Sequence, residues 1–132
     1  MNPSEFIKEK AKEWFAKAEN DLKSAEIILE DPQPPTDTAC YHCQQAVEKY
    51  LKGLLTYHQI EFIKTHDLDY LYKLAVEKIN LHDYREDILS LNKYAIEARY
   101  PADIPVIYSM EEAKAALDKA REITKFIKSN LD

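Results

Sequence analysis

Glycine is almost absent from this sequence, with one residue among 132. Tight β-hairpin turns usually need backbone torsions that glycine adopts most easily, so the chain has little material for them. Runs of alternating polar and apolar residues, which mark half-buried strands, are missing too. Glu, Lys, Ala and Leu dominate, and all four favour helices. The composition therefore predicts an all-α protein.

Basic charge and long apolar runs are also scarce. The formal net charge is −6 and the isoelectric point is near 5.3, whereas proteins that hold duplex nucleic acid by its phosphates are usually basic. Broad nucleic-acid binding is therefore disfavoured, although a local basic site is compatible with this average. Residues 1–23 mix charges throughout, so we expect no signal peptide, no membrane span and a cytoplasmic location.

The length and the two cysteines argue against a fold that depends on metal or disulfides. A chain of 132 residues fits one domain, spanning positions 1–132, which can bury enough surface to fold unaided. Cys40 and Cys43 form a single C-x-x-C pair, but structural zinc takes four ligands. A thioredoxin-type motif follows a strand, and none is predicted. We expect both cysteines to pack in the core, with no metal and no cofactor.

Five segments carry the 3.6-residue hydrophobic period of amphipathic helices. We expect them to begin near residues 3, 37, 67, 84 and 110. Capping boxes at residues 2–5 and 109–112 mark the first and last starts, and Thr65 or Asp67, then Asp83, cap the third and fourth. Short connections predict an antiparallel up-down bundle of four to five helices. In such a bundle the third and fifth helices begin, and the fourth ends, at the same end.

That shared end gathers residues suited to a phosphate group. Lys64 and His66 precede the third predicted helix, whose free N–H groups attract anions. Arg99 and Tyr100 close the fourth, and a guanidinium with a ring beside it suits a nucleotide. Each feature alone is more typical of ordinary helix capping. Together they predict a ligand-binding site.

The second helix carries a polar row opposite its apolar stripe, made of Tyr41, Gln45, Glu48 and Lys52. Glu48 and Lys52 form an i,i+4 pair worth a few tenths of a kcal/mol. Spacing alone favours a solvated helix face. The alternative is a face through which the protein contacts a partner.

Taken in order, several blocks of the sequence resemble the HEPN family. They are Trp14, Ala18 and Asp21-Leu22; Gln44-Gln45-Ala46, Glu48-Lys49 and Leu51-Lys52; Thr65-His66-Asp67-Leu68; Arg99-Tyr100-Pro101; and Glu112-Ala113. The resemblance implies an antiparallel helical bundle that pairs into a homodimer. It is similar to the substrate-binding helical domain of some nucleotidyltransferases. Members often accompany a minimal nucleotidyltransferase, as a complex or a toxin–antitoxin pair.

The sequence departs from the ribonucleases of that family. Their pattern is an Arg followed, after four to six residues, by a His. Counted from Arg99, positions 104–106 hold Ile, Pro and Val, and neither Arg85 nor Arg121 has such a His. Cleavage of this kind needs a group that moves the 2′-hydroxyl proton, and His is the usual one. The departure favours binding over catalysis.

Three hypotheses follow. The first is a non-catalytic, dimeric HEPN protein that binds a nucleotide or another phosphate-bearing ligand, RNA included, and partners a nucleotidyltransferase. The second is a ribonuclease toxin in which His66 replaces the missing histidine. The third is an interaction module whose Glu48 and Lys52 face serves assembly alone.

Overall fold

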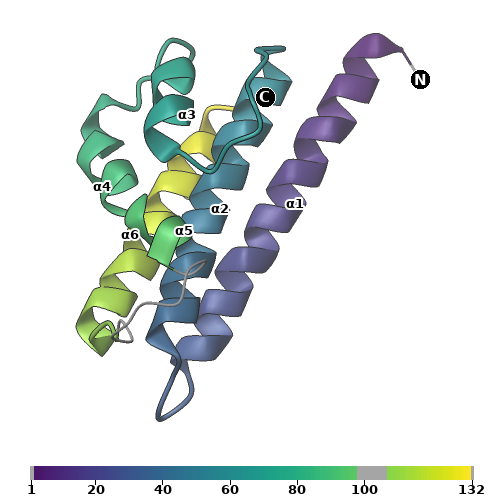
Figure 1. Ribbon diagram of the computed structural model, residues 1–132. Coiled ribbons are helices and arrows are strands. Elements are labelled where there is room, and N and C mark those ends of the chain that lie inside the picture. The colour runs from purple at the N-terminus through teal and green to yellow at the C-terminus, as the bar shows by residue number, and fades with distance from the viewer. Residues whose placement is uncertain (1, 98–106, 132) are drawn as a thin grey trace.

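The computed structural model describes residues 2–97 and 107–131, and every regular element in those ranges is helical (Figure 1). In chain order the elements are α1 (Pro3–Leu29), α2 (Thr36–Tyr57), α3 (Leu68–Ala75), the 3-10 helix η1 (His82–Tyr84), α4 (Arg85–Ser90), α5 (Lys93–Glu97) and α6 (Met110–Ser129). The all-α prediction is confirmed. None of these described helices is both long and apolar enough to cross a bilayer.

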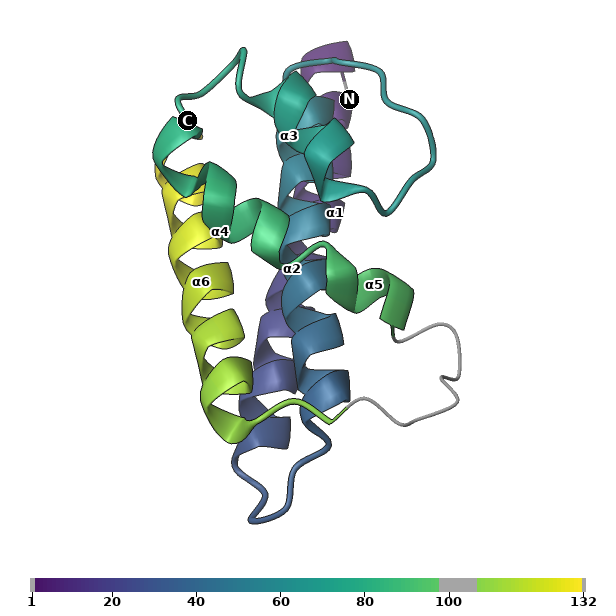
Figure 2. The same cartoon turned by 60° about the vertical axis from the view of Figure 1, so that its left-hand side comes forward.

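The long helices alternate in direction with the segment between them. In Figure 2, α1 descends, α2 ascends, the stretch from α4 to α5 runs obliquely downwards across α2 from the α6 side, and α6 ascends. The largest helix contact is between α1 and α2, and α6 packs mainly on α2. The predicted up-down bundle is confirmed. α2 is its central helix, which explains why most of its residues are buried.

Two helix starts follow the local sequence as predicted. The side chain of Asn2 accepts the N–H of Glu5 at 2.9 Å, and the carboxylate of Glu5 accepts the backbone N–H of Asn2 at 3.4 Å. Ser109 caps α6 by accepting the N–H of Glu112 at 3.0 Å, but the predicted capping box there is only half formed, since the Glu112 carboxylate accepts from the hydroxyl of Tyr94 at 2.6 Å. Such caps satisfy N–H groups that have no partner inside the helix. Short-range signals therefore fix where α1 and α6 begin.

The predicted fourth helix is broken into pieces. In place of one helix capped by Asp83, the chain forms η1, α4 and α5, with a turn at Leu91 and Asn92 and no side-chain cap before η1 or α4. The side chain of Asn92 accepts the N–H of Leu68 at 2.9 Å and donates to Asp67 at 3.1 Å. This long-range contact holds the break against the start of α3, and the hydrophobic period alone does not reveal it.

Gly53, in the middle of α2, serves close packing and not a turn. A methyl group added there would lie 2.4 Å from the ring of Phe15. Phe15 in turn stacks on Tyr50, with ring centroids 5.0 Å apart. The absent side chain therefore lets α1 and α2 approach closely at this point.

The end of α2 directs the following loop back over the helix. Gln59 adopts φ 57°, the left-handed conformation, and the N–H of Ile60 donates to the carbonyl of Leu55 at 2.9 Å. The N–H of Gln59 donates to Thr56 at 3.0 Å. These bonds form a Schellman cap without its usual glycine. The loop of residues 58–67 then returns along α2.

Both cysteines pack in the core, as predicted. Cys40 and Cys43 are fully buried, free of a disulfide and surrounded by apolar side chains. Burial raises the pKa of the Cys40 thiol to about 11 and that of the Cys43 thiol to about 12. Both thiols are therefore protonated at neutral pH and are poor nucleophiles.

Candidate functional site

A row of polar side chains on α2 is buried and not solvated. Gln44, Gln45, Glu48 and Lys52 have exposed fractions of 0%, 7%, 2% and 6%. The solvated face that spacing favoured for the last three is therefore wrong. The loop of residues 58–67 returns over this side of α2, and α1 packs along it, so water is largely excluded.

Glu48 lies at the centre of this row. Its Oε1 accepts hydrogen bonds from Nε2 of Gln44 at 3.2 Å and of Gln45 at 3.3 Å, and its Oε2 accepts from Nζ of Lys52 at 3.0 Å. Gln45 also donates to Oε1 of Gln44 at 2.7 Å. A buried carboxylate without partners would cost several kcal/mol, so these donors hold Glu48 in one position.

His66 extends the network from the interior to the surface. Its Nδ1 lies 2.9 Å from Oε1 of Glu48, and because a carboxylate only accepts, Nδ1–H is the donor. The backbone carbonyl of His66 accepts from Gln44 at 3.2 Å. Glu48 is 3% exposed at its side chain and His66 is 36% exposed. We call this group the Glu48 cluster: Gln44, Gln45, Glu48, Lys52 and His66.

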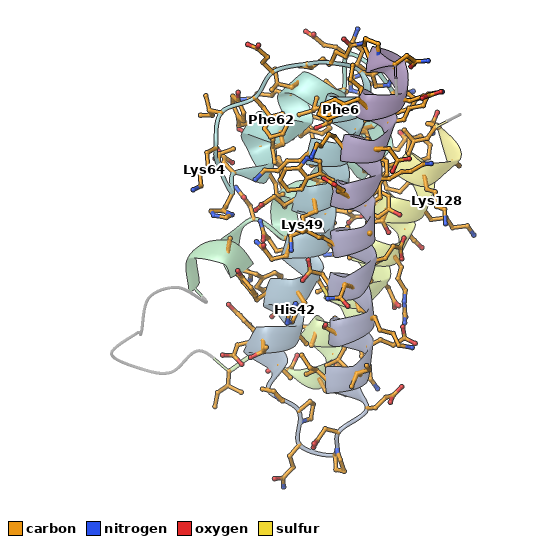
Figure 3. The ribbon with its side chains drawn as sticks, turned by 90° about the vertical axis from the view of Figure 1, so that its right-hand side faces the viewer. Phe6, His42, Lys49, Phe62, Lys64 and Lys128 are labelled. Atoms are coloured by element: carbon orange, nitrogen blue, oxygen red, sulfur yellow. The ribbon has the colours of Figure 1, made fainter. Side chains whose placement is uncertain are left out.

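Aromatic side chains close the cluster on the α1 side. Nζ of Lys52 lies 5.4 Å from the ring centroid of Trp14, within cation–π range. Trp14 meets Phe62 edge to face at 6.4 Å. Figure 3 shows Phe62 on the same side of α1 as Lys49 and Lys64. The ammonium of Lys52 is thus paired with Glu48 on one side and covered by the ring of Trp14 on the other.

A second buried carboxylate forms a similar group beside the first. Oδ1 of Asp21 lies 2.8 Å from Nδ1 of His42, and Oδ2 accepts from Nζ of Lys49 at 2.6 Å. Tyr41 contacts the His42 ring at 5.9 Å between centroids. Each group joins one carboxylate, one lysine and one histidine, and Glu48 is the residue before Lys49. The predicted polar face of α2 therefore belongs to two groups. Tyr41 lies beside the Asp21 group, and the other three residues of that face belong to the Glu48 cluster.

The sequence pattern did not reveal a site role for Asp21, His42 or Lys49. The available signal was the position of Asp21, three residues after Ala18 and directly before Leu22, beside the apolar stripe of α1. An acid placed there must be buried with a cation from a facing helix. The sequence did not show which cation that is.

The N-terminus of α3 is capped from within the chain. Asp67 accepts the N–H of Asp69 at 3.0 Å, and Asn92 accepts that of Leu68 at 2.9 Å. Asp67 is thus the cap that the sequence favoured, and these two bonds leave fewer N–H groups free for an anion than an uncapped helix start would have. A ligand at the start of α3 would therefore be bound by side chains. One of them is Lys64, which is exposed in the loop before the helix (Figure 3).

Arg99 and Tyr100 lie outside the described residues, so their role at this site stays a prediction. Of the other two predicted members, His66 belongs to the Glu48 cluster, and Lys64 is exposed in the same loop.

The start of α3 and the start of α6 do not lie at the same end of the bundle, contrary to the prediction. The start of α6 lies beside the start of α2, because Thr36 donates to the carbonyl of Tyr108 at 2.7 Å. His66 lies beside Glu48, and positions 36 and 48 are about 18 Å apart along the axis of α2. The return of residues 58–67 along α2 separates His66 from the start of α6.

The chemistry available in the Glu48 cluster is oriented hydrogen bonding. Glu48 already accepts from four side chains, so it is placed to orient His66 and not to take a proton from a substrate. Within the part of the chain that the structure describes, no three His, Cys, Asp or Glu side chains gather as metal ligands would. The group that reaches the surface is the imidazole of His66.

Comparison with known protein families shows to which family the chain belongs. The HEPN domain matches residues 11–130. The chain belongs to the HEPN family. The match contains both buried carboxylates, Asp21 and Glu48, with their histidines and lysines. The resemblance drawn from the sequence is confirmed.

Individual relatives span nearly the whole chain. The sequence is 28% identical to "Putative toxin MJ1304" of Methanocaldococcus jannaschii over 99% of this chain and 94% of that protein. The crystal structure of TT1696 from Thermus thermophilus is 30% identical, covers 92% of this chain and 98% of its own, and superposes with a TM-score of 0.81. ST0689, an archaeal HEPN homologue, shares the fold with a TM-score of 0.73 and 24% identity, over 90% of this chain and 95% of its own.

Proposed function

We propose that this HEPN protein binds a phosphate-bearing ligand, a nucleotide or RNA, around His66 without cleaving it. The supporting observation is the Glu48–His66 pair, in which a buried carboxylate fixes an imidazole that is 36% exposed. A side chain held in place before binding loses little freedom when the ligand arrives. Lys64 adds a positive charge in the same loop, and Arg99 and Tyr100 complete the proposed set.

Binding without cleavage follows from the neighbours of His66. A general acid–base mechanism needs one group to remove the 2′-hydroxyl proton and another to protonate the leaving oxygen. Glu48 and Lys52 are buried and bonded to each other at 3.0 Å. His42 is bonded to Asp21 in the neighbouring group. None of these three side chains is therefore placed to act as the second catalytic group.

A ribonuclease toxin is the second candidate function. The name of the relative from Methanocaldococcus jannaschii contains the word toxin. A histidine oriented by a carboxylate is also the arrangement that general acid–base catalysis uses. In this version, His66 takes the role of the histidine that positions 104–106 lack.

The proposal extends to partners, on the strength of the family resemblance. We infer a homodimer and a complex with a nucleotidyltransferase. Light scattering at micromolar concentration checks the first, and a mass near the 15.4 kDa of one chain contradicts it. Co-purification with a nucleotidyltransferase encoded next to this protein checks the second.

Two measurements separate binding from cleavage. Calorimetric titration with AMP, ADP and ATP tests ligand binding, and a fluorescently labelled RNA incubated with purified protein tests cleavage. The proposal predicts nucleotide binding and intact RNA. RNA cleavage that His66→Ala abolishes and His82→Ala leaves unchanged establishes the ribonuclease. Protein that neither binds nucleotides nor cleaves RNA leaves an interaction module, whose contact face lies elsewhere than the buried Glu48 and Lys52 row.

A further inference from the structure

The groove between α1 and α6 collects positive charge. It lies on the side of α1 away from Phe62 and Lys64, where Figure 3 shows Lys128. Six cationic side chains line it: Lys8, Lys12, Lys23, Arg121, Lys125 and Lys128. The carboxylates that line it are those of Glu19 and Glu26. The chain as a whole has a net charge of −6, so the groove is a local region of positive charge on an acidic protein.

The groove is long as well as basic. It consists of two adjoining cavities, of about 360 and 460 Å³, which share Glu19 and Lys128. Along α1 it runs from Lys8 to Glu26, which at 1.5 Å per residue is about 27 Å. That length suits an extended or helical segment of a macromolecule more than a small molecule.

One end of the groove is apolar. Its lining there includes Phe15, Tyr50, Tyr57 and Leu131. The hydroxyl of Tyr50 donates to Glu19, so the polar atom of that ring already has a partner. Aromatic and aliphatic surface therefore lies directly beside the lysines.

Most cations of the groove are not used by the fold. Arg121 pairs with Glu26 at 3.1 Å, and Lys12 pairs with Glu9 at 3.7 Å. Across residues 2–97 and 107–131, the other four lysines of the groove form no ion pair. Unpaired cations that share a groove favour a negatively charged partner.

We propose that this groove docks an acidic amphipathic segment of a partner protein. One apolar side chain occupies the end lined by Phe15, and carboxylates lie opposite the lysines. A buried apolar contact flanked by charges is the usual anatomy of a helix in a groove, and about 27 Å corresponds to about five helical turns. Glu19 and Glu26 interrupt the row of cations, so the evenly charged backbone of a nucleic acid fits less well. The groove is separate from His66, and the inference does not depend on the function proposed above.

Selection from a phage library of random 18-residue peptides tests the proposal on the full chain. Peptides enriched on the wild type should be acidic and carry an apolar residue near one end. Fluorescence anisotropy then measures the affinity of one enriched peptide, labelled with fluorescein. The triple variant Lys23→Glu, Lys125→Glu and Lys128→Glu should weaken binding at least tenfold.

A matched control separates the groove from net charge. The triple variant Lys17→Glu, Lys78→Glu and Lys114→Glu makes the same charge change at exposed positions outside the groove, and should alter affinity less than twofold. If charge reversal unfolds the groove variant, judged by circular dichroism, the corresponding Lys→Gln triple replaces it, with a loss of at least threefold expected. Enriched peptides without acidic bias, or equal losses in groove and control variants, overturn the proposal. Tighter binding of a fluorescein-labelled 18-nucleotide oligouridylate than of the peptide also overturns it, provided that the groove triple variant weakens the RNA binding and His66→Ala does not.

Discussion

The carboxylate of Glu48 and the imidazole of His66 lie 2.9 Å apart, although the residues are 18 positions apart in the sequence. One is almost fully buried in the bundle and the other reaches the surface. Lys52 binds the second oxygen of the same carboxylate at 3.0 Å. Glu48 therefore has two roles, as the counter-charge of a buried lysine and as the group that orients His66. Each role can be tested separately.

Glu48→Ala should destabilise the protein by about 3–5 kcal/mol, the cost of leaving one partner of a buried ion pair without the other. The side chain of Lys52 is only 7% exposed, so water cannot replace the lost carboxylate beside its ammonium group. Urea unfolding followed by tryptophan fluorescence measures the change. The double variant Glu48→Leu and Lys52→Met removes both charges and should recover at least half of the lost stability. A double variant as unstable as Glu48→Ala shows that the unpaired lysine is not the cause.

Gly53→Ala should destabilise the protein by about 1 kcal/mol, against the usual helical preference. Alanine in a helix interior gains about 1 kcal/mol over glycine. Here the new methyl group lies 2.4 Å from the ring of Phe15, which must leave its stack on Tyr50, and such overpacking costs about 1–3 kcal/mol. Urea midpoints give the difference. In a Phe15→Ala background the same substitution should instead stabilise, and a loss of stability there argues against the Phe15 contact as the cause.

Local signals in the sequence predicted the helices but not the break between α4 and α5. The caps at Asn2 and Ser109 act on residues three positions away, within reach of a sequence pattern. The break depends on Asn92 bonding to Leu68, 24 positions earlier. A contact between residues so far apart in the sequence forms only when the helices pack together, and the hydrophobic period of one segment does not predict it.

The candidate site was predicted in parts, and its assembly was not. The sequence separated His66 from the Glu48 and Lys52 row, because one precedes a helix and the others lie within one. The Schellman cap at Gln59 starts the return of the loop that brings them together. That cap carries no glycine, so its usual sequence signal is absent. Burial of the Glu48 row follows from the same loop.

Alkaline pH should weaken the fold through the two buried thiols. The pKa values of Cys40 and Cys43 are raised from 9.0 to about 11 and about 12 by burial. Between pH 9 and 11 the unfolded chain loses protons that the folded chain keeps. The unfolding free energy therefore falls as pH rises, by up to about 1.4 kcal/mol per pH unit for each thiol. No such loss occurs below pH 8.

Urea unfolding at pH 8, 9 and 10 measures this slope. Burial also raises the pKa of Tyr50 and Tyr94 from 10.0, so a part of the slope close to pH 10 remains without the cysteines. The variant Cys40→Ala and Cys43→Ala loses core packing at every pH and should show a shallower slope between pH 9 and 10. The same slope in both proteins contradicts the thiol explanation.

The most direct test of the central claim is the affinity of His66→Ala for the nucleotide that binds the wild type best, measured by calorimetry. Loss of an oriented histidine donor should weaken binding by about 1–3 kcal/mol. The affinity of His82→Ala, whose contact to Tyr72 is long at 3.4 Å, should stay within twofold of wild type. Unchanged affinity in His66→Ala, with the protein folded, contradicts a ligand site at the Glu48 cluster.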